Sequence, residues 1–144
     1  MIVKDYKTKR ANGSVMEKLI QIFFPDLNER VLIKLDESRS PKTVKGLLDS
    51  LPIEVNINKW GKELYTDKIP VTLHEENAKS ELNLLDVAFW PEGSALCLFY
   101  GPTPINKSNK IEPYYPVNLV GRILSESDII DRVRDGSRVI VKHA

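Results

Sequence analysis

The sequence predicts a mainly β protein, a closed barrel of about eight strands with two short helices at its ends. Short apolar or alternating runs recur along most of the chain, and turn residues separate them. Two stretches instead have the apolar period of an amphipathic helix. Because helices and strands do not alternate, a doubly wound parallel sheet is excluded.

The expected strands are short. Residues 17–24 (EKLIQIFF) and 30–35 (RVLIKL) flank the turn PDLNE and predict an N-terminal hairpin, with Ile20, Ile22 and Phe24 on one face of its first strand. The alternation of apolar residues and the turn signals between them predict the other strands. These are expected over residues 53–60, 63–65, 69–74, 84–90, 94–100, 117–124 and 137–143.

The two helices are expected over residues 40–51 and 125–136. Ser40 is expected to cap the first helix through its side chain, and Pro41 suits the first helical position because no hydrogen bond is lost there. Gly136 fits the left-handed position that ends the second helix. The buried stripes are Val44, Leu47, Leu48 and Leu51 in the first helix and Ile129, Ile130 and Val133 in the second.

A chain of 144 residues is about one domain. We expect residues 1–14 to be a polar N-terminal lead-in and residues 15–144 to form a single barrel domain. The proline-containing segment 101–116 is the longest expected loop.

Composition limits the classes of partner. The net charge of +1 provides no general field for nucleic acid or an anionic membrane, so neither is expected as a partner. Basic clusters at residues 4–10 and 132–142 lack stacking aromatic residues and are interpreted as solvated surface. One cysteine and two histidines do not make a zinc cage, so no metal or cofactor is expected. The start has no secretory apolar region and no run reaches membrane-spanning length, which favours a cytoplasmic protein.

Several motifs carry a family resemblance. RVLIKLDESRSPKTVKGLL resembles the cyclophilin strand that leads into a PKT-started helix, GSALCLFYGPT is similar to the GSQFF-type strand, and VNLVGRILSESDIIDRV to the VVFGKVVEG-type strand and helix. NKWGKELY, DVAFWPEGSALCLFYGPTP and PVNLVGRI together resemble the small archaeal and bacterial cyclophilin-like family of uncharacterised proteins. The resemblance covers about residues 17–144 and implies a cyclophilin-like barrel.

The residues that make cyclophilins prolyl isomerases do not carry over. In that family an Arg and a following FMxQGGDF-type segment hold the prolyl peptide, whereas VNINKWGKELYTDKIPV has no Arg, Gln or Gly-Gly pair. The Gln of the GSQFF-type motif falls on Ala95, its second following aromatic on Cys97, and the family's His on Val117. Lys59 is the nearest cation in sequence, and a flexible ammonium replaces a guanidinium poorly. The resemblance therefore implies the fold without the catalytic set, and no catalytic residue is assigned.

Candidate ligand-binding residues come from the same motifs. Trp60 and Trp90 each lie at a turn, and a tryptophan whose N–H needs a partner suits the lip of a pocket. Glu63 with Asp86 could form an acid/base pair, although a solvated or capping carboxylate is the preferred interpretation. Cys97 is interpreted as a buried apolar side chain rather than a nucleophile. The candidates are Trp60, Glu63, Tyr65, Trp90, Thr103, Asn118 and Asn58.

We therefore expect a non-catalytic binding module for a peptide segment or a small molecule. One alternative is a divergent, weak peptidyl-prolyl cis-trans isomerase. Another is an accessory or assembly subunit, including a homodimer formed through an exposed edge strand. A pocket enclosing both tryptophans would favour binding, a cation beside an apolar cleft would favour the isomerase, and a symmetric strand contact would favour assembly.

Overall fold

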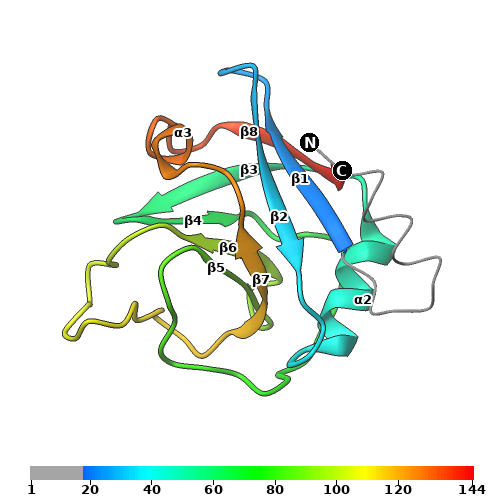
Figure 1. Cartoon of the computed structure of the whole chain (residues 1–144). Helices are drawn as coiled ribbons and strands as arrows, with labels where there is room; N and C mark the ends of the chain where they lie inside the picture. The colour runs from blue at the N-terminus through cyan, green and yellow to red at the C-terminus, as the bar shows by residue number, and fades with distance from the viewer. Residues whose placement is uncertain (1–17) are drawn as a thin grey trace.

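The computed structural model describes residues 18–144, and in this range eight strands form one closed barrel (Figure 1). The expected lead-in at residues 1–14 lies outside the described residues. The strands are β1 (Lys18–Phe24), β2 (Glu29–Leu35), β3 (Ile53–Trp60), β4 (Glu63–Thr66), β5 (Asp86–Trp90), β6 (Ala95–Phe99), β7 (Asn118–Ile123) and β8 (Arg138–His143). The helices are α2 (Pro41–Ser50) and α3 (Ser127–Asp131). The predicted fold class is confirmed.

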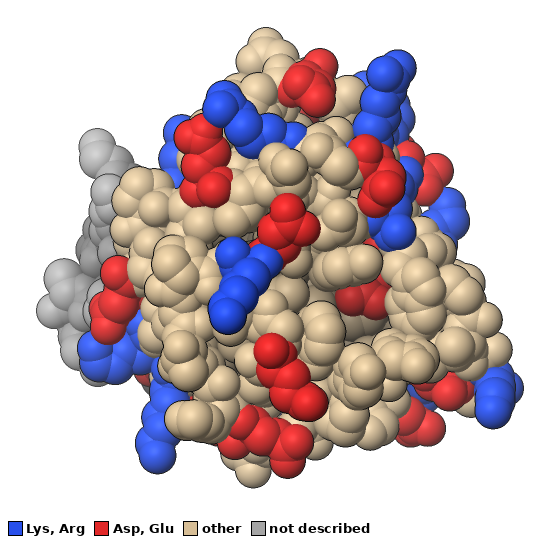
Figure 2. All heavy atoms as spheres, turned by 180° about the vertical axis from the view of Figure 1, so that it is seen from behind, with Lys and Arg blue, Asp and Glu red and all other residues tan. Residues whose placement is uncertain are grey.

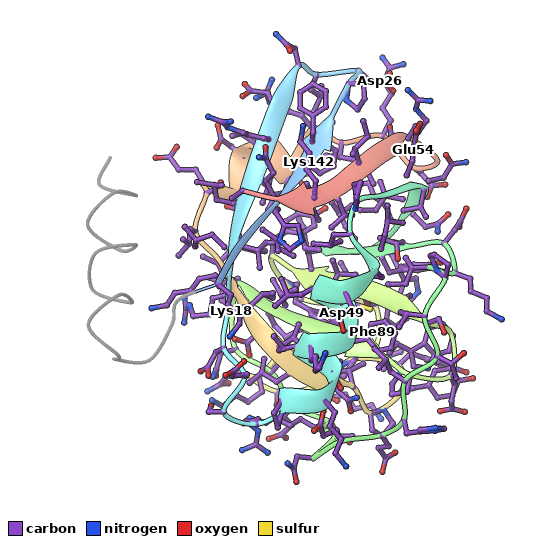
Figure 3. All side chains as sticks on the ribbon, turned by 90° about the vertical axis from the view of Figure 1, so that its right-hand side faces the viewer. Lys18, Asp26, Asp49, Glu54, Phe89 and Lys142 are labelled. Atoms are coloured by element: carbon purple, nitrogen blue, oxygen red, sulfur yellow. The ribbon has the colours of Figure 1, made fainter. Side chains whose placement is uncertain are left out.

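Each strand pairs with two antiparallel neighbours. Around the barrel the order is β1-β2-β7-β5-β6-β4-β3-β8, and β8 returns to pair with β1. The predicted N-terminal hairpin is present, with register from Lys18↔Leu35 to Phe24↔Glu29. Asp26 lies in the turn at its tip (Figure 3). Closure gives every strand backbone partners on both sides.

The barrel interior is the main hydrophobic core. Alternate residues of the strands point into it, as with the fully buried Ile20, Ile22 and Phe24 of β1. Phe89 of β5 lies inside the molecule (Figure 3) and is fully buried. Burial of each such large apolar side chain contributes about 1.5–3 kcal/mol to folding. Apolar alternation in the sequence therefore corresponds to packing around one closed core.

The helices lie on opposite sides of the barrel and add side chains to the same core (Figure 1). Helix α2 contributes Val44 and Leu47, and the α3 region contributes Ile130 and Val133. The second helix is shorter than the expected span of 125–136, since it ends at Asp131 and turns follow it. None of the helices in residues 18–144 has the length and apolar character needed to cross a membrane.

The prediction that Ser40 caps α2 through its side chain is wrong. Its hydroxyl instead donates to the Glu76 carbonyl oxygen at 3.4 Å. The Glu76 carboxylate takes the capping role, accepting the backbone N–H groups of Lys42 (3.0 Å) and Thr43 (2.9 Å) and the Thr43 hydroxyl (2.7 Å). Burial alone would raise the pKa of Glu76, but these hydrogen bonds outweigh it and lower that pKa. At a helix N-terminus an ionised carboxylate is a stronger acceptor than a hydroxyl, which accounts for capping by Glu76 instead of Ser40.

The prediction of a strand over residues 69–74 is also wrong. Pro70 has no N–H to donate to a ladder, and this segment runs as irregular chain. Isolated hydrogen bonds hold it to the turn before β6: Ile69 N–H donates to Ser94 O (2.9 Å), and the Ser94 hydroxyl donates to Val71 O (3.0 Å). Ile69 is nonetheless buried in the main core. The apolar alternation here reports burial rather than strand pairing.

Candidate functional site

A pocket of about 280 Å³ lies on the outer face of the barrel, where β3, β4, β5 and β6 meet beneath the loop of residues 101–117. On β4, Leu64 points into the barrel core, whereas Glu63 and Tyr65 point outward. Figure 2, which looks at the back of the molecule, shows a hollow bordered mainly by uncharged residues with acidic atoms in it. The lining residues are Trp60, Glu63, Tyr65, Trp90, Cys97, Pro113, Tyr114, Tyr115 and Val117.

Strand register brings the pocket residues together. Trp60, the last residue of β3, pairs with Glu63, the first of β4, across the turn that Gly61 makes at φ +59°. Tyr65 of β4 pairs with Cys97 of β6. Directly opposed residues of an antiparallel pair share one face of the sheet, so these four side chains lie on the same outer surface.

Strand β6 is buried on both faces. Leu96, Leu98 and Tyr100 join the barrel core, whereas Ala95, Cys97 and Phe99 join a second, outer cluster with Ala88, Leu82, Ile111 and Val117. The stretch GSALCLFYGPTP thus forms both part of the core and part of the pocket floor. Cys97 is buried, as expected, and burial raises its thiol pKa well above the ordinary value.

The 101–117 loop is an ordered cover over this outer cluster. The Thr103 hydroxyl donates to Glu112 O at 2.6 Å. The Asn106 amide oxygen accepts the backbone N–H groups of Thr103 (3.1 Å) and Glu112 (3.0 Å). Ile111 forms a bridge with Leu82. These bonds fix the loop immediately before Pro113, where it enters the pocket wall.

A row of four aromatic rings runs from the end of β3 to the end of β5, and its two middle rings belong to the 101–117 loop. The Trp60 and Tyr114 rings meet edge to face with centroids 5.9 Å apart, and Tyr114 meets Tyr115 in the same way at 4.7 Å. Tyr115 stacks on Trp90, with centroids 5.2 Å apart and planes 8° apart. Tyr114 is 65% exposed and Tyr115 44% exposed, so this aromatic row forms the rim of the pocket.

The position of the Trp90 ring requires that residue 93 has no side chain. A Cβ atom at Gly93 would lie 2.2 Å from the Trp90 ring, so the Pro91–Ser94 turn brings bare backbone against the indole. Among the described residues, the buried Trp90 Nε1 has no hydrogen-bond acceptor. The indole position is therefore set by the ring contacts with the turn and Tyr115 rather than by its N–H group.

Glu63 is the acidic group of the pocket. Its side chain is 7% exposed, and burial raises its pKa to about 7. The neighbouring Cys97 thiol, which donates to Ala95 O at 3.7 Å, opposes this rise only in part. Burial, with the Glu63 charge as a smaller cause, also raises the pKa of Tyr65. The carboxyl is thus close to half ionised at neutral pH.

The two lysines nearest to Glu63 in the sequence donate to Asp131 rather than to Glu63. Lys59 Nζ donates to Asp131 O at 2.9 Å, and Lys62 Nζ to the Asp131 carboxylate at 2.7 Å. Within residues 18–144, the set that lines the pocket includes no lysine or arginine. Among the described residues Glu63 therefore has no cationic partner of the kind that a buried carboxylate usually has.

Asp86 does not pair with Glu63. It is buried at the start of β5, where its carboxylate accepts the Asn83 N–H at 2.8 Å, and it does not line the pocket. Burial raises its pKa, while this bond and the nearby Arg122 oppose the rise. Asp86 is therefore a loop-capping carboxylate.

Four of the candidate residues lie together in the pocket: Trp60, Glu63, Tyr65 and Trp90. The other three do not line it. Asn58 Nδ2 donates to the Asp67 carboxylate (2.9 Å) and Tyr65 O (3.3 Å), and Thr103 holds the loop as described above. Asn118 is fully buried, bonded to Thr43 Oγ1 (3.0 Å), His74 O (2.9 Å) and Glu76 N (2.8 Å).

Sequence reasoning did not include five lining residues among the candidates: Cys97, Pro113, Tyr114, Tyr115 and Val117. The Tyr114–Tyr115 pair carried a usable signal, because two adjacent aromatic residues after a proline in a polar loop are poor candidates for full burial. Nothing local in the sequence indicates that the pair meets both tryptophans, since that contact depends on the path of the loop.

Comparison with known proteins agrees with the barrel fold. The Cyclophilin-like family model matches residues 18–142. The solution structure of the hypothetical protein AF2241 from Archaeoglobus fulgidus is similar, with 39% identity over 89% of this chain and 95% of that chain and a TM-score of 0.76. The structure of McbB in complex with tryptophan is similar at 20% identity over 86% of this chain and 44% of that chain, with a TM-score of 0.66, which shows a shared fold. A search of curated proteins gave no match.

The family model spans nearly all of the described barrel, and the archaeal relative is similar in both sequence and fold. The chain belongs to the cyclophilin-like family.

Proposed function

We propose that the outer pocket binds a flat-ringed ligand, either a small molecule or the aromatic side chain of a peptide segment, with a cationic or hydrogen-bond donor group facing Glu63. The observation that carries this proposal is a buried carboxylate that has no cationic partner within residues 18–144 and lies in a pocket bordered by aromatic rings. Aromatic walls select flat apolar groups, and a few convergent polar atoms fix their orientation.

The size of the pocket supports a small ligand. Its volume of about 280 Å³ is near the lower end of the roughly 300–1,000 Å³ usual for small-molecule sites. The aromatic rim offers edges and faces from Trp60, Tyr114 and Tyr115. Each well-placed ring contact contributes about 0.5–1.5 kcal/mol beyond area burial. A ligand of one or two rings matches this site.

The charge of the pocket supports a cationic or donor group. Burial raises the pKa of Glu63 to about 7, and a bound ammonium would favour its ionised form. Aromatic faces also attract cations. A cationic ligand should therefore bind more tightly as pH rises from 5 to 8, and below pH 7 its binding should release a proton from Glu63.

An indole is a suitable ring for a test ligand because its two fused rings suit the volume of the pocket. McbB, a protein of the same fold, has a structure in complex with tryptophan. That likeness concerns the fold alone, so the choice of probe rests on the pocket described above.

The two alternatives have less support. An isomerase of the cyclophilin type needs a rigid cationic donor, and the lining residues described in 18–144 offer none. Assembly through an edge strand is not favoured by a barrel in which each strand already has two neighbours. Two-dimensional NMR exchange on an Ala-Pro peptide tests the first alternative, and we expect no catalysed cis-trans cross-peaks.

The binding test is calorimetry with a matched series of tryptamine, indole and indole-3-acetate at pH 8. We expect tryptamine to bind about 10–100-fold more tightly than indole, since a charge-assisted contact is worth about 1.5–3 kcal/mol, and indole-3-acetate to bind most weakly. Glu63→Gln should remove most of this order, and Trp90→Ala should weaken all three ligands. Glu81→Gln, at an exposed carboxylate outside the pocket, is the control. The proposal is wrong if none of the three binds, or if the order survives Glu63→Gln.

A further inference from the structure

The Glu63 carboxylate is buried and lines the outer pocket. We propose that the pocket is catalytic as well as ligand-binding, and that Glu63 acts as the general base that removes a proton from a flat substrate held against the aromatic rim. This inference rests on the binding function proposed above and adds a reaction to it. The substrate class is a flat carbon or nitrogen acid whose proton faces the β4 side of the pocket.

Glu63 differs from the other buried carboxylate described in the barrel. Asp86 is held by the Asn83 N–H at 2.8 Å, with Arg122 close enough to stabilise its charge. Glu63 lies beside the Cys97 thiol, which donates to Ala95 O, and it shares the pocket with aromatic rings. Asp86 has a structural use in its loop, whereas Glu63 is aimed into a cavity.

The surroundings of Glu63 favour its action as a base. The titratable groups that share the pocket are the phenols of Tyr65, Tyr114 and Tyr115 and the Cys97 thiol, and none of them can carry a positive charge. A carboxylate with little solvation and no cation is a stronger base than one in water. With its pKa near 7, the side chain can both accept and return a proton at neutral pH, which is the condition for efficient general acid–base catalysis.

The chemistry does not pass through the cysteine. Burial and the nearby Glu63 charge raise the thiol pKa well above its ordinary value, so little thiolate is present at neutral pH. A nucleophilic cysteine needs the opposite environment, with a cation or a helix N-terminus beside it. Proton transfer without a covalent intermediate is the reaction that this set of side chains supports.

A suitable probe is 5-nitrobenzisoxazole, a flat two-ring molecule with one acidic C–H bond. The Glu63 carboxylate would take the ring C–H proton, and the electron pair of that bond would form the third bond of a nitrile. The N–O bond breaks, and the oxygen leaves as a phenolate. The proton on Glu63 then passes to water, which restores the carboxylate. No oxidant, reductant or second substrate is needed.

The experiment compares wild type, Glu63→Gln and Glu81→Gln, following the coloured phenolate by absorbance from pH 5 to 9. We expect kcat/KM of wild type to rise with an apparent pKa near 7 and to exceed that of Glu63→Gln by about 100-fold or more. Glu81→Gln should behave as wild type. Equal rates for wild type and Glu63→Gln would overturn the proposal.

Binding of the unreactive analogue 5-nitroindazole separates the two ways to fail. If wild type and Glu63→Gln both bind the analogue and neither accelerates the reaction, the pocket binds flat ligands and the general-base inference is wrong. If the analogue does not bind wild type, the binding function fails and the inference fails with it. Misfolding of Glu63→Gln is not expected, because the variant removes a buried ionisable group and keeps the shape of the side chain.

Discussion

Replacing Glu63 with glutamine will change how the stability of the protein depends on pH. The carboxyl pKa is 4.5 in the absence of a perturbing environment and about 7 in the folded protein, because burial disfavours the charged form. Each tenfold change in an equilibrium constant is worth about 1.4 kcal/mol, so the ionised side chain lowers the free energy of unfolding by about 3 kcal/mol. The side chain is 7% exposed, so solvent screens little of this effect.

The direction of this pH dependence follows from whether the folded and the unfolded chain hold the Glu63 proton at a given pH. Below pH 4.5 both folded and unfolded chains hold the proton, and Glu63 has no effect on stability. Between pH 4.5 and 7 the folded chain keeps the proton that the unfolded chain has released, so stability falls as pH rises. Above pH 7 both states are ionised and the full loss is present. Glutamine is neutral at every pH, so the Glu63→Gln variant does not lose this stability.

Urea unfolding of wild type and Glu63→Gln from pH 4 to 9 measures this difference. We expect the two proteins to have similar free energies of unfolding at pH 4, and the variant to be more stable by about 3 kcal/mol at pH 8, equivalent to about 10 °C in Tm. Subtraction at each pH removes the contributions of other titrating groups. Glu81→Gln controls for loss of a surface carboxylate. A difference that stays constant across this range would refute the burial argument.

Three further substitutions test the supports of the fold and site. Glu76→Ala should lower the free energy of unfolding by about 1–2 kcal/mol in urea at pH 7, since α2 loses its cap, and an unchanged midpoint would contradict that role. Gly93→Ala should cost about 1–3 kcal/mol and alter the near-ultraviolet circular dichroism of Trp90, because the new methyl group overlaps the indole; an unaltered spectrum would refute the contact. Thr103→Val removes the 2.6 Å bond to Glu112 O and should weaken tryptamine binding about threefold or more by calorimetry, whereas equal affinity would show that this bond does not hold the pocket wall.

Much of the barrel could be predicted from local pattern. The hairpin over residues 18–35 combined alternating apolar residues with a clear turn, and both signals come from neighbouring residues. The failures involve partners distant in sequence. Ser40 had the right chemistry for a cap, but Glu76 reaches the same N–H groups from a loop far along the chain. In residues 69–74 the apolar alternation was right about burial and wrong about the ladder, because Pro70 lacks a donor.

The residues of the candidate site were likewise predictable where they share a local motif and not where their contacts depend on distant parts of the chain. Trp60, Glu63 and Tyr65 lie within one hairpin, so a single motif contained them, and Trp90 lay in a second motif of the same kind. Asn118 was chosen for its polarity, but its amide is used in holding helix α2, through Thr43, and the loop that carries Glu76. The aromatic pair of the 101–117 loop went unassigned because ring-to-ring contact depends on three-dimensional path. Strand register, which the sequence did not define between β4 and β6, is what places Cys97 beside Glu63.

The most direct test of the ligand-binding pocket uses the two tryptophans, because the sequence contains two and both line it. In a ¹H–¹⁵N spectrum each gives one indole N–H signal, so tryptamine can be titrated at pH 8 while both are followed. We expect both signals to move with a single Kd, together with the backbone amides of Glu63–Thr66. Indole signals that stay fixed while amides elsewhere in the barrel move would place the ligand outside the pocket and contradict the account.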